Sequence, residues 1–201
     1  KKVLITGASK RIGSAMAMEC AKNGWDIVLH YNKSKRICYE LQKKLLKISK
    51  SVEIFNADLS KEKEVVDLFK SASKFSPINA LINNASLFTK DRLKDAFHER
   101  ASTELQVNLL APLDLIRQFA EQTKSGLILN ILDRRIKAHD TSCIPYSLSK
   151  IALAELTRLA ALELAPNFRV NGVAPGPILP TSGTTEAHFK ENKGTIPMGL
   201  I

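Results

Sequence analysis

Short apolar runs and amphipathic stretches alternate along the whole chain. Apolar runs bounded by turn residues are typical of buried strands, and they predict strands over 3–5, 25–30, 52–56, 80–82, 126–131 and 168–174. Apolar residues that recur at helical spacing predict helices over 12–22, 35–49, 61–71, 102–121 and 145–164. Because strands and helices alternate, the pattern predicts one α/β domain over residues 1–201, a doubly wound parallel sheet of at least six strands with helices on both faces.

Two of the predicted helices carry a further feature. In the 102–121 stretch, Asn108 stands shortly before Pro112, and a proline lacks a backbone donor and clashes with the preceding turn. We therefore expect a kink that leaves nearby carbonyl groups free for water. The 145–164 helix is apolar on two sides, which predicts that one side packs on the sheet and the other on a second subunit.

The first strand leads through a glycine-containing turn, Thr6-Gly7-Ala8-Ser9-Lys10-Arg11-Ile12-Gly13, into an Ala-rich helix. Gly7 permits a conformation closed to side chains, and Gly13 allows the helix to pack closely on the sheet. The free N–H groups of the first helical turn then face a phosphate. The stretch therefore predicts the opening of a dinucleotide-binding βαβ unit, with an ordinary βα turn as the alternative. Arg11 replaces a middle glycine, and its guanidinium can bond to an anion.

The end of the second strand meets the adenosine ribose in such a unit, and an acidic residue there selects NAD. This chain has no Asp or Glu at that point; the polar and basic residues that it offers instead are His30, Asn32, Lys33, Ser34, Lys35 and Arg36. Together with Arg11 they predict a pocket for a 2′-phosphate and hence NADP(H), with a plain polar loop as the alternative. Two charge-assisted hydrogen bonds of about 1.5–3 kcal/mol each would favour NADP(H) about a hundredfold or more.

Polar residues also follow the third and fourth strands. Asp58 stands where a carboxylate can accept a hydrogen bond from the adenine amino group. Alternatively Asp58 or Ser60 caps the 61–71 helix, and each residue can hold one of the two roles. Asn83 and Asn84 at the end of the fourth strand suit backbone bonding inside a tight crevice.

The composition is the one expected of a soluble globular protein. The mean hydropathy is −0.09, and no apolar run approaches the ~18 residues of a membrane span. The first residues enter a strand directly, so we expect no secretory leader. The three cysteines, Cys20, Cys38 and Cys143, form no C-x-x-C pair, which favours a reducing and cytoplasmic location.

The net charge of +10, from 30 Lys and Arg against 20 Asp and Glu, permits association with nucleic acid or a membrane surface. The positive residues are scattered, however, apart from a lysine-rich face over 43–50, and no aromatic residues interleave with them as a base-stacking platform. We therefore expect a solvated surface, a small-molecule substrate, and neither a nucleic-acid nor a membrane partner.

A phenol and an ammonium group, Tyr146 and Lys150, lie one helical turn apart on one face of the 145–164 helix. A tyrosine with a pKa of about 10 is a weak acid at neutral pH, and lowering it by about 3 units takes about 4 kcal/mol. In a dry site an adjacent Lys⁺ and an oxidised nicotinamide can supply this together. The helix is entered from the carboxyl end of a strand, on the cofactor side of the sheet.

These motifs together resemble the short-chain dehydrogenase/reductase family. The match rests on Thr6-Gly7-x5-Gly13, Asn83-Asn84-Ala85, Asn108, Tyr146-x3-Lys150 and Pro175-Gly176, in the right order over essentially the whole chain. The resemblance implies a Rossmann-type α/β/α fold, an NAD(P)(H)-dependent oxidoreductase without a metal, and a homotetramer or homodimer. It also implies that Tyr146 donates the proton, Lys150 holds the nicotinamide ribose, and Asn108 anchors a water relay. Members usually continue with a seventh strand and a further helix, which would follow Ile201.

One position departs from the family pattern. Asp133 stands thirteen residues before Tyr146, where the family usually has serine, and an ionised carboxylate cannot donate to a substrate carbonyl. The sequence here is similar to the pteridine reductase or dihydromonapterin reductase-like branch, which uses Asp with Tyr and Lys. That branch implies that Arg11, Ser86 and Phe88 line the substrate site, Phe88 stacking on a flat heterocycle. Alternatively Asp133 pairs with Arg134 or Arg135, and Phe88 packs in the core.

The resemblance places further residues at each ligand. At the cofactor these are Ser9, Lys10, Ile12, Leu59, Asn84, Ala85, Ser86, Pro175, Gly176 and Ile178, and at the substrate Pro177. We expect an NADPH-dependent reductase acting on C=N or C=O, with a dihydropteridine-like substrate favoured. The alternatives are a carbonyl or 3-oxoacyl reductase, a non-catalytic NADP(H)-binding regulator, and a nucleic-acid binder with strongly salt-dependent affinity.

Overall fold

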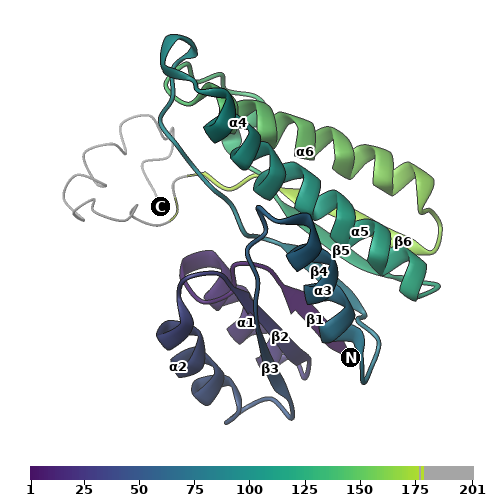
Figure 1. The fold of residues 1–201 in the computed structure, drawn as a ribbon. Coiled ribbons are helices and arrows are strands. Elements are labelled where there is room, and N and C mark those ends of the chain that lie inside the picture. Colours follow the sequence, from purple (N-terminus) through teal and green to yellow (C-terminus); the bar gives the residue numbers. More distant parts are fainter. Residues whose placement is uncertain (177, 179–201) are drawn as a thin grey trace.

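Six parallel strands form one sheet in the order β3-β2-β1-β4-β5-β6 in the computed structural model, which describes residues 1–176 and 178 (Figure 1). The strands are β1 (Lys2–Ile5), β2 (Asp26–Tyr31), β3 (Val52–Asn56), β4 (Ala80–Asn83), β5 (Gly126–Ile131) and β6 (Phe168–Val173). The main helices are α1 (Arg11–Lys22), α2 (Lys35–Leu45), α3 (Glu62–Ser73), α4 (His98–Leu105), α5 (Ala111–Gln122) and α6 (Ile144–Glu163). This is the Rossmann-type fold that the alternating pattern predicts.

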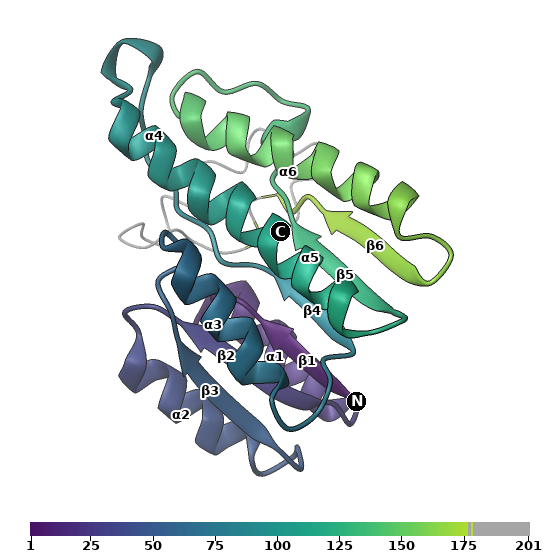
Figure 2. The same cartoon turned by 45° about the vertical axis from the view of Figure 1, so that its right-hand side comes forward.

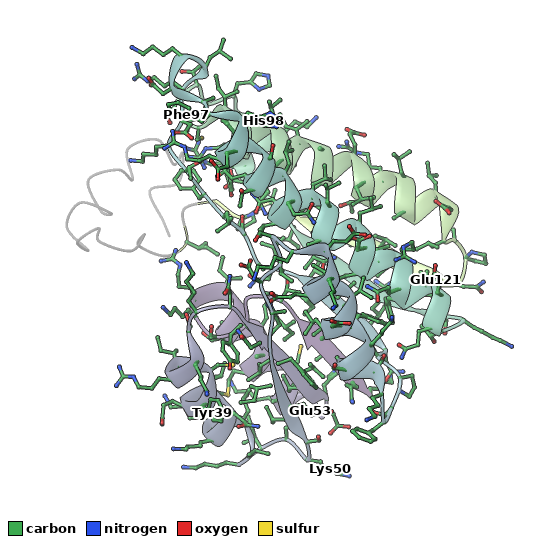
Figure 3. The ribbon with its side chains drawn as sticks, viewed as in Figure 1. Tyr39, Lys50, Glu53, Phe97, His98 and Glu121 are labelled. Atoms are coloured by element: carbon green, nitrogen blue, oxygen red, sulfur yellow. The ribbon has the colours of Figure 1, made fainter. Side chains whose placement is uncertain are left out.

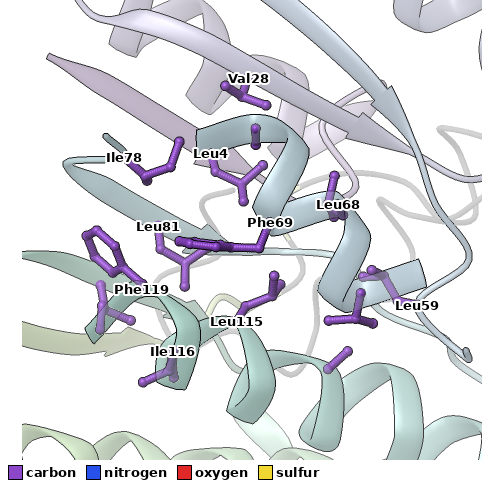
Figure 4. Close-up of a cluster of buried hydrophobic side chains, with 14 of the residues drawn as sticks. Leu4, Val28, Leu59, Leu68, Phe69, Ile78, Leu81, Leu115, Ile116 and Phe119 are labelled. Atoms are coloured by element: carbon purple, nitrogen blue, oxygen red, sulfur yellow. The ribbon is translucent and has the colours of Figure 1, made fainter. Parts of the chain in front are cut away.

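The two faces of the sheet carry separate cores, because side chains alternate along each strand. On one face Leu4, Leu81 and Ile128 pack with α3 and α5, and Figure 4 shows Phe69 and Phe119 of these helices turned into the cluster. On the other face Val3, Ile5 and Ile27 pack against α1 and α2. The turned view of Figure 2 shows the sheet between these helices. The expected three layers are therefore present.

The carboxyl ends of the strands meet along one edge. Ile5 pairs with Leu29 of β2 on one side and with Ile82 of β4 on the other, so the strand order reverses at β1. In an open parallel sheet such a reversal opens a crevice where ligands bind. The turns that follow β1, β2, β4 and β5 all begin at this edge.

Strand positions agree with the prediction to within about a residue, whereas two helices differ from it. The helix predicted over 35–49 ends at Leu45, because the Ser49 hydroxyl bonds to the carbonyl oxygens of Trp25 (2.9 Å) and Ser51 (3.1 Å) instead. The helix predicted over 102–121 starts earlier, at His98, and the expected irregularity before Pro112 is a π-helical segment, Gln106–Leu110.

Charged side chains are spread over the surface, as the scattered sequence pattern predicts. Figure 3 labels Lys50 and Glu53 at one end of the molecule, and Phe97 and His98 at the other. Several form ion pairs one helical turn apart, such as Arg117 with Glu121 at 2.9 Å. Within the described part of the chain, no helix combines the length and apolarity that crossing a membrane requires.

Candidate active site

The turn after β1 is shaped to receive a phosphate group. Gly7 has a φ of 61°, which favours glycine, and a Cβ there would lie 2.9 Å from Ala85 Cα. A Cβ on Gly13 would lie 2.4 Å from the Gly7 carbonyl oxygen, so α1 packs against the turn as closely as backbone allows. The first turn of α1 holds no acidic residue, and no described side chain caps it. The N–H groups of this helix end therefore suit a bound pyrophosphate.

Thr6 and Asn84 fasten this turn to the end of β4. The Asn84 amide Nδ2 donates to the carbonyl oxygens of Thr6 (2.8 Å) and Gly7 (3.1 Å). In return, the Thr6 hydroxyl oxygen accepts hydrogen bonds from the backbone N–H groups of Asn84 (2.9 Å) and Ala85 (3.0 Å). The two strand ends that flank the crevice are thus held in one fixed geometry.

Arg11 occupies an unusual backbone conformation in this turn. Its φ is 53°, in the left-handed region that glycine adopts without strain and where an arginine is uncommon. Its side chain is exposed at the start of α1, as are those of Lys10, Asn32 and Lys33. The position that the sequence marks as a replaced glycine therefore keeps the backbone shape of a glycine while presenting a guanidinium at the crevice.

His30 is placed differently from the expected phosphate contact. The ring is 2% exposed, its Nδ1 accepts from the Gly7 N–H (3.1 Å), and its Nε2 lies 3.0 Å from the Ala57 carbonyl oxygen. Burial lowers the pKa of His30, so the ring is neutral at pH 7 and both nitrogens are engaged by backbone. His30 therefore supports the turn from below, and the expectation that it contacts the 2′-phosphate is corrected.

The loop after β2 lies beside the end of β3. The Asn56 amide donates to the carbonyl oxygens of Tyr31 (3.0 Å) and Asn32 (2.6 Å), and this fixes the segment that carries Lys33 and Ser34. Asp58 accepts from both the N–H (3.0 Å) and the hydroxyl (2.8 Å) of Ser60. These bonds lower the pKa of Asp58, with smaller contributions from lysines.

Asp58 therefore shapes the turn before α3 but does not cap the helix, whose N-cap residue Lys61 receives no side-chain cap bond. The contact of Asp58 with adenine stays a prediction. The side chain of Leu59, expected at the cofactor, is 4% exposed and packs in the core.

Tyr146 and Lys150 both turn from α6 toward the end of β5. The Tyr146 hydroxyl donates to Asp133 Oδ2 (2.9 Å), and Lys150 Nζ donates to the Ile131 carbonyl oxygen (2.8 Å) and lies 5.9 Å from the Tyr146 ring. Both side chains are buried. The helical spacing thus brings phenol, ammonium and carboxylate into one cluster at the crevice.

Asp133 contacts both Tyr146 and Arg135. Besides accepting the Tyr146 hydroxyl, it accepts the Arg135 N–H at Oδ1 (2.9 Å) and forms an ion pair with Arg135 NH1 (3.2 Å). Arg135 in turn pairs through Nε with Asp140 Oδ2 (3.0 Å). Pairing with an arginine, which the sequence presents as an alternative to a catalytic role, coexists with the contact to Tyr146.

Burial governs the electrostatics of this cluster. It raises the pKa of Tyr146, and the Asp133 carboxylate raises it further, while Arg135 and a hydrogen bond from Ser86 act in the opposite direction. Burial also lowers the pKa of Lys150 to about 8, with Asp133 opposing the change. The groups of the chain together therefore raise the phenol pKa, opposite to the lowering that the sequence analysis expects with a cofactor bound.

The Asn108 side chain extends from the π-helical segment and holds the loop that follows β4. Its Oδ1 accepts from the Leu87 N–H (2.8 Å) and the Ser86 hydroxyl (3.2 Å), and its Nδ2 donates to the Leu87 carbonyl oxygen (2.9 Å) and Ser149 Oγ (3.0 Å). An amide has two acceptor and two donor positions, and these four bonds use them all. The side chain therefore positions the loop that carries Ser86 and Phe88, and the expected water relay at Asn108 stays a prediction.

Phe88 lies at the mouth of the cluster and not in the core. It is 46% exposed, and its ring meets the Tyr146 ring edge to face, with centroids 4.8 Å apart. The Arg135 guanidinium lies 5.5 Å from the Phe88 centroid. An exposed ring beside the reactive phenol is available for a flat ligand to stack on.

The other predicted residues lie as follows. Ser9 is buried and Ile12 half-buried in the turn, while Ala85 packs against Gly7. Pro175, Gly176 and Ile178 follow β6 on the same edge of the sheet, and Pro177 lies outside the described residues.

A family model described as short chain dehydrogenase matches residues 1–192. The chain belongs to the short-chain dehydrogenase family. It is accordingly an NAD(P)-dependent oxidoreductase of that type, and the crevice with Tyr146 and Lys150 is its candidate active site.

Three similar proteins illustrate the range of this short-chain dehydrogenase's relatives. The structure of FolM alternative dihydrofolate reductase 1 from Brucella canis, complexed with NADP, superimposes with a TM-score of 0.91 at 32% identity, covering 99% of this chain and 80% of that one. The uncharacterized oxidoreductase YmfI of Bacillus subtilis is 30% identical over all of this chain and 85% of its own length. The 3-oxoacyl-[acyl-carrier-protein] reductase FabG of Staphylococcus epidermidis is 31% identical, over 88% and 74%.

Several residues of this short-chain dehydrogenase's site escape prediction from the sequence. Arg135 is named in the sequence analysis only as a possible ion-pair partner, and Thr6, Asp140 and Ser149 are not assigned to the site. The Asp133-x-Arg135 spacing is the one local signal, since residues two apart flank a single turn. The other contacts join segments that are distant in the sequence, and only the fold brings them together.

Proposed function

We propose that this short-chain dehydrogenase is an NADPH-dependent reductase that delivers a hydride to the C=N bond of a dihydropteridine-like heterocycle. The observation that carries the proposal is the hydrogen bond from Tyr146 to Asp133, at the position where the family usually has serine. An ionised carboxylate accepts from N–H and O–H groups but cannot donate to a carbonyl oxygen. The likeness to the Brucella canis FolM protein, a dihydrofolate reductase by name, supports the same substrate class.

The choice of NADP(H) rests on the residues around the turn. Arg11, Lys33 and Ser34 stand where the ribose phosphate would lie, and no acidic residue occurs between Tyr31 and Arg36 to bind a ribose hydroxyl. The close approach of Gly7 and Gly13 leaves backbone at the surface for the pyrophosphate. The residues present therefore fit a phosphorylated dinucleotide.

In this reaction the residues of the chain orient the substrate and move one proton. Bound NADPH supplies the hydride, which reduces the carbon of the C=N bond by two electrons. The Tyr146 hydroxyl turns from Asp133 and gives its proton to the ring nitrogen, and solvent later replaces it. Lys150, held by the Ile131 carbonyl, keeps a positive charge beside the phenol and reaches the nicotinamide ribose. Phe88 supplies a stacking surface.

The proposal is tested by steady-state oxidation of NADPH with a panel of dihydropterins, dihydrofolate, simple ketones and 3-oxoacyl thioesters. We expect turnover with the reduced pterins and little with ketones. A preference for 3-oxoacyl thioesters would replace the proposal by the second candidate, which the similarity to FabG favours. Binding of NADPH without turnover of any compound, unaffected by Tyr146→Phe, would indicate a regulatory NADP(H)-binding protein.

We also propose that the protein works as a homodimer or homotetramer. The outer side of α6 exposes Leu148 (57%), Leu159 (62%) and Leu162 (77%), and Leu110 and Leu113 are exposed at the start of α5. Apolar side chains gathered on neighbouring helices are typical of a subunit interface. Light scattering checks this: an assembly that Leu159→Glu dissociates is the expected result, and a monomer at all concentrations would contradict it.

A further inference from the structure

Arg135 lies between the catalytic carboxylate and a second carboxylate. Its NH1 lies 3.2 Å from Asp133 Oδ1 and 3.3 Å from Oδ2, and its Nε donates to Asp140 Oδ2 (3.0 Å). The side chain is 18% exposed. A guanidinium that is held at two edges has one orientation, because its donors lie in a rigid plane.

The bonds from Arg135 leave Asp133 with little freedom to rotate. A carboxylate accepts about four hydrogen bonds, two at each oxygen. Oδ1 receives the Arg135 backbone N–H (2.9 Å) and NH1, while Oδ2 receives NH1 and the Tyr146 hydroxyl (2.9 Å). Turning the carboxylate would break several of these at once, so Oδ2 stays directed at the phenol.

Asp140 fixes Arg135 from the far side. Its Oδ1 accepts from the N–H (2.9 Å) and the hydroxyl (2.6 Å) of Ser142, just before α6 begins. These bonds, and the pairing with Arg135, hold the pKa of Asp140 well below its ordinary range. The chain Ser142–Asp140–Arg135–Asp133 therefore ends on the acceptor of the Tyr146 proton.

The charges that face Asp133 come from two segments. Tyr146 and the buried Lys150 face it from α6, and Arg135 faces it from its own segment, with Asp140 and Cys143 beyond the guanidinium. Arg135 also opposes the larger effect of burial on the pKa of Tyr146. Removal of Arg135 would leave Asp133 and Asp140 without the guanidinium that they share.

We infer that Arg135 is a positioning residue for the reduction: anchored by Asp140, it fixes and neutralises Asp133 so that one carboxylate oxygen faces the Tyr146 hydroxyl. The inference rests on the proposed function in that it takes Tyr146 as the proton donor. It adds that the direction of Asp133 depends on a residue that touches neither hydride nor substrate nitrogen.

The test compares Arg135→Met with Arg135→Lys, Asp140→Asn and the neighbouring control Arg134→Gln, an exposed arginine of the same turn. The kcat and KM are measured on the best substrate of the panel, with NADPH binding by fluorescence and thermal unfolding for each variant. Carbon NMR at one fixed pH reports the surroundings of the Asp133 carboxyl without turnover, its resonance assigned by its loss in Asp133→Asn.

We expect Arg135→Met to lower kcat about 10- to 100-fold, as misplacement of a reacting group does. KM and NADPH affinity should change by less than about threefold, since neither ligand loses a contact. The carboxyl resonance of Asp133 should move in Arg135→Met and stay in place in Arg134→Gln. Arg135→Lys, which restores the charge but not the planar fork, should return kcat only in part. Asp140→Asn should act in the same direction, more weakly.

The inference is overturned if the carboxyl resonance and kcat of folded Arg135→Met coincide with those of Arg134→Gln. Should Arg135→Met fail to fold, Asp140→Asn decides by the same comparison, because it removes the anchor and keeps the guanidinium. An inactive wild type would refute the proposed function alone, and the carboxyl resonance would still decide whether Arg135 controls Asp133.

Discussion

The hydroxyl of Tyr146 and Oδ2 of Asp133 lie 2.9 Å apart, joining two residues thirteen positions apart in the sequence. One belongs to the first turn of α6 and the other follows β5, so the bond links a helix to the sheet edge where the crevice opens. Alone, a tyrosine hydroxyl is a weak acid at neutral pH. In this site the hydrogen-bonded pair of Tyr146 and Asp133 lies between the ammonium of Lys150 and the guanidinium of Arg135.

Replacing Tyr146 by phenylalanine removes the proton donor and little else. We expect Tyr146→Phe to lower kcat by a factor of about a thousand or more, because general acid catalysis contributes about 10²–10⁴-fold. NADPH affinity should stay within about twofold, since the phenol reaches the reacting bond and not the phosphates. Tyr39→Phe on the exposed side of α2 is the matched control and should keep full activity. Stopped-flow rates and NADPH fluorescence check this; a Tyr146→Phe enzyme with near-normal kcat would contradict it.

Asp133 sets the kind of bond that is reduced. Asp133→Ser supplies the hydroxyl that is usual in the family, so we expect activity on dihydropterins to fall about a hundredfold while activity on ketones rises. Asp133→Asn, which has the shape but not the charge, should lose dihydropterin reduction without gaining ketone reduction. Competition assays with both substrate classes measure the ratio, and an unchanged ratio in Asp133→Ser would show that another residue decides.

Substitutions of Arg11 can separate the effect of its guanidinium on cofactor binding from the effect of its backbone conformation on stability. Arg11→Gly suits the φ of 53° better than the native residue, so we expect unfolding stability unchanged or raised by up to about 1 kcal/mol. Arg11→Ala keeps the unfavourable φ, so its unfolding stability should rise less than that of Arg11→Gly. Both should weaken NADPH about 10- to 100-fold, the worth of one charge-assisted bond, and NADH far less. Titration calorimetry with the two cofactors checks this, and equal losses would refute the 2′-phosphate assignment.

The pH dependence of kcat/KM and of stability should report the titration of the buried Lys150 ammonium. The pKa of Lys150 is lowered from 10.5 to about 8 by burial, so its charge is lost as the pH rises through 8, and kcat/KM should fall on that side. Between pH 8 and 10.5 the unfolded chain binds the proton and the folded chain does not, so this lysine makes stability rise with pH there.

Lys150→Met should therefore be inactive yet more stable than the wild type below pH 8, by about 1–3 kcal/mol, with the gain fading toward pH 10.5. Denaturant unfolding at several pH values measures this. A wild type that is more stable than Lys150→Met at pH 7 would contradict the cost assigned to the buried cation.

Much of the fold follows from local pattern. The buried strands are apolar runs ended by turn residues, and Gly126–Ile131 coincides with its predicted bounds because both faces of β5 require apolar residues. The helix predicted over 102–121 is interrupted for a reason that is not local. Asn108 bonds to the backbone of Leu87, and this contact is formed only when α4 and α5 pack beside the loop after β4.

The residues of the site also divide into those that local sequence patterns identify and those that only the fold brings together. Gly7, Gly13, Tyr146 and Lys150 were identifiable because fixed spacings carry their chemistry. His30 misled because the sequence shows a polar residue at a strand end and not the direction of its side chain, which the alternation of β2 turns inward. The roles of Arg135 and Asp140 depend on the path of the loop between β5 and α6, which no periodicity in the sequence predicts.

The central claim is that this crevice passes a hydride from NADPH to a ring carbon while Tyr146 protonates the neighbouring nitrogen. Mass spectrometry of the pterin formed from NADPH deuterated at the transferring position tests it directly. We predict one deuterium per pterin formed by the wild type, and formation of this labelled pterin about a thousandfold slower with Tyr146→Phe. A pterin without deuterium from an enzyme that oxidises NADPH, or an unchanged rate of labelled pterin formation with Tyr146→Phe, would contradict it.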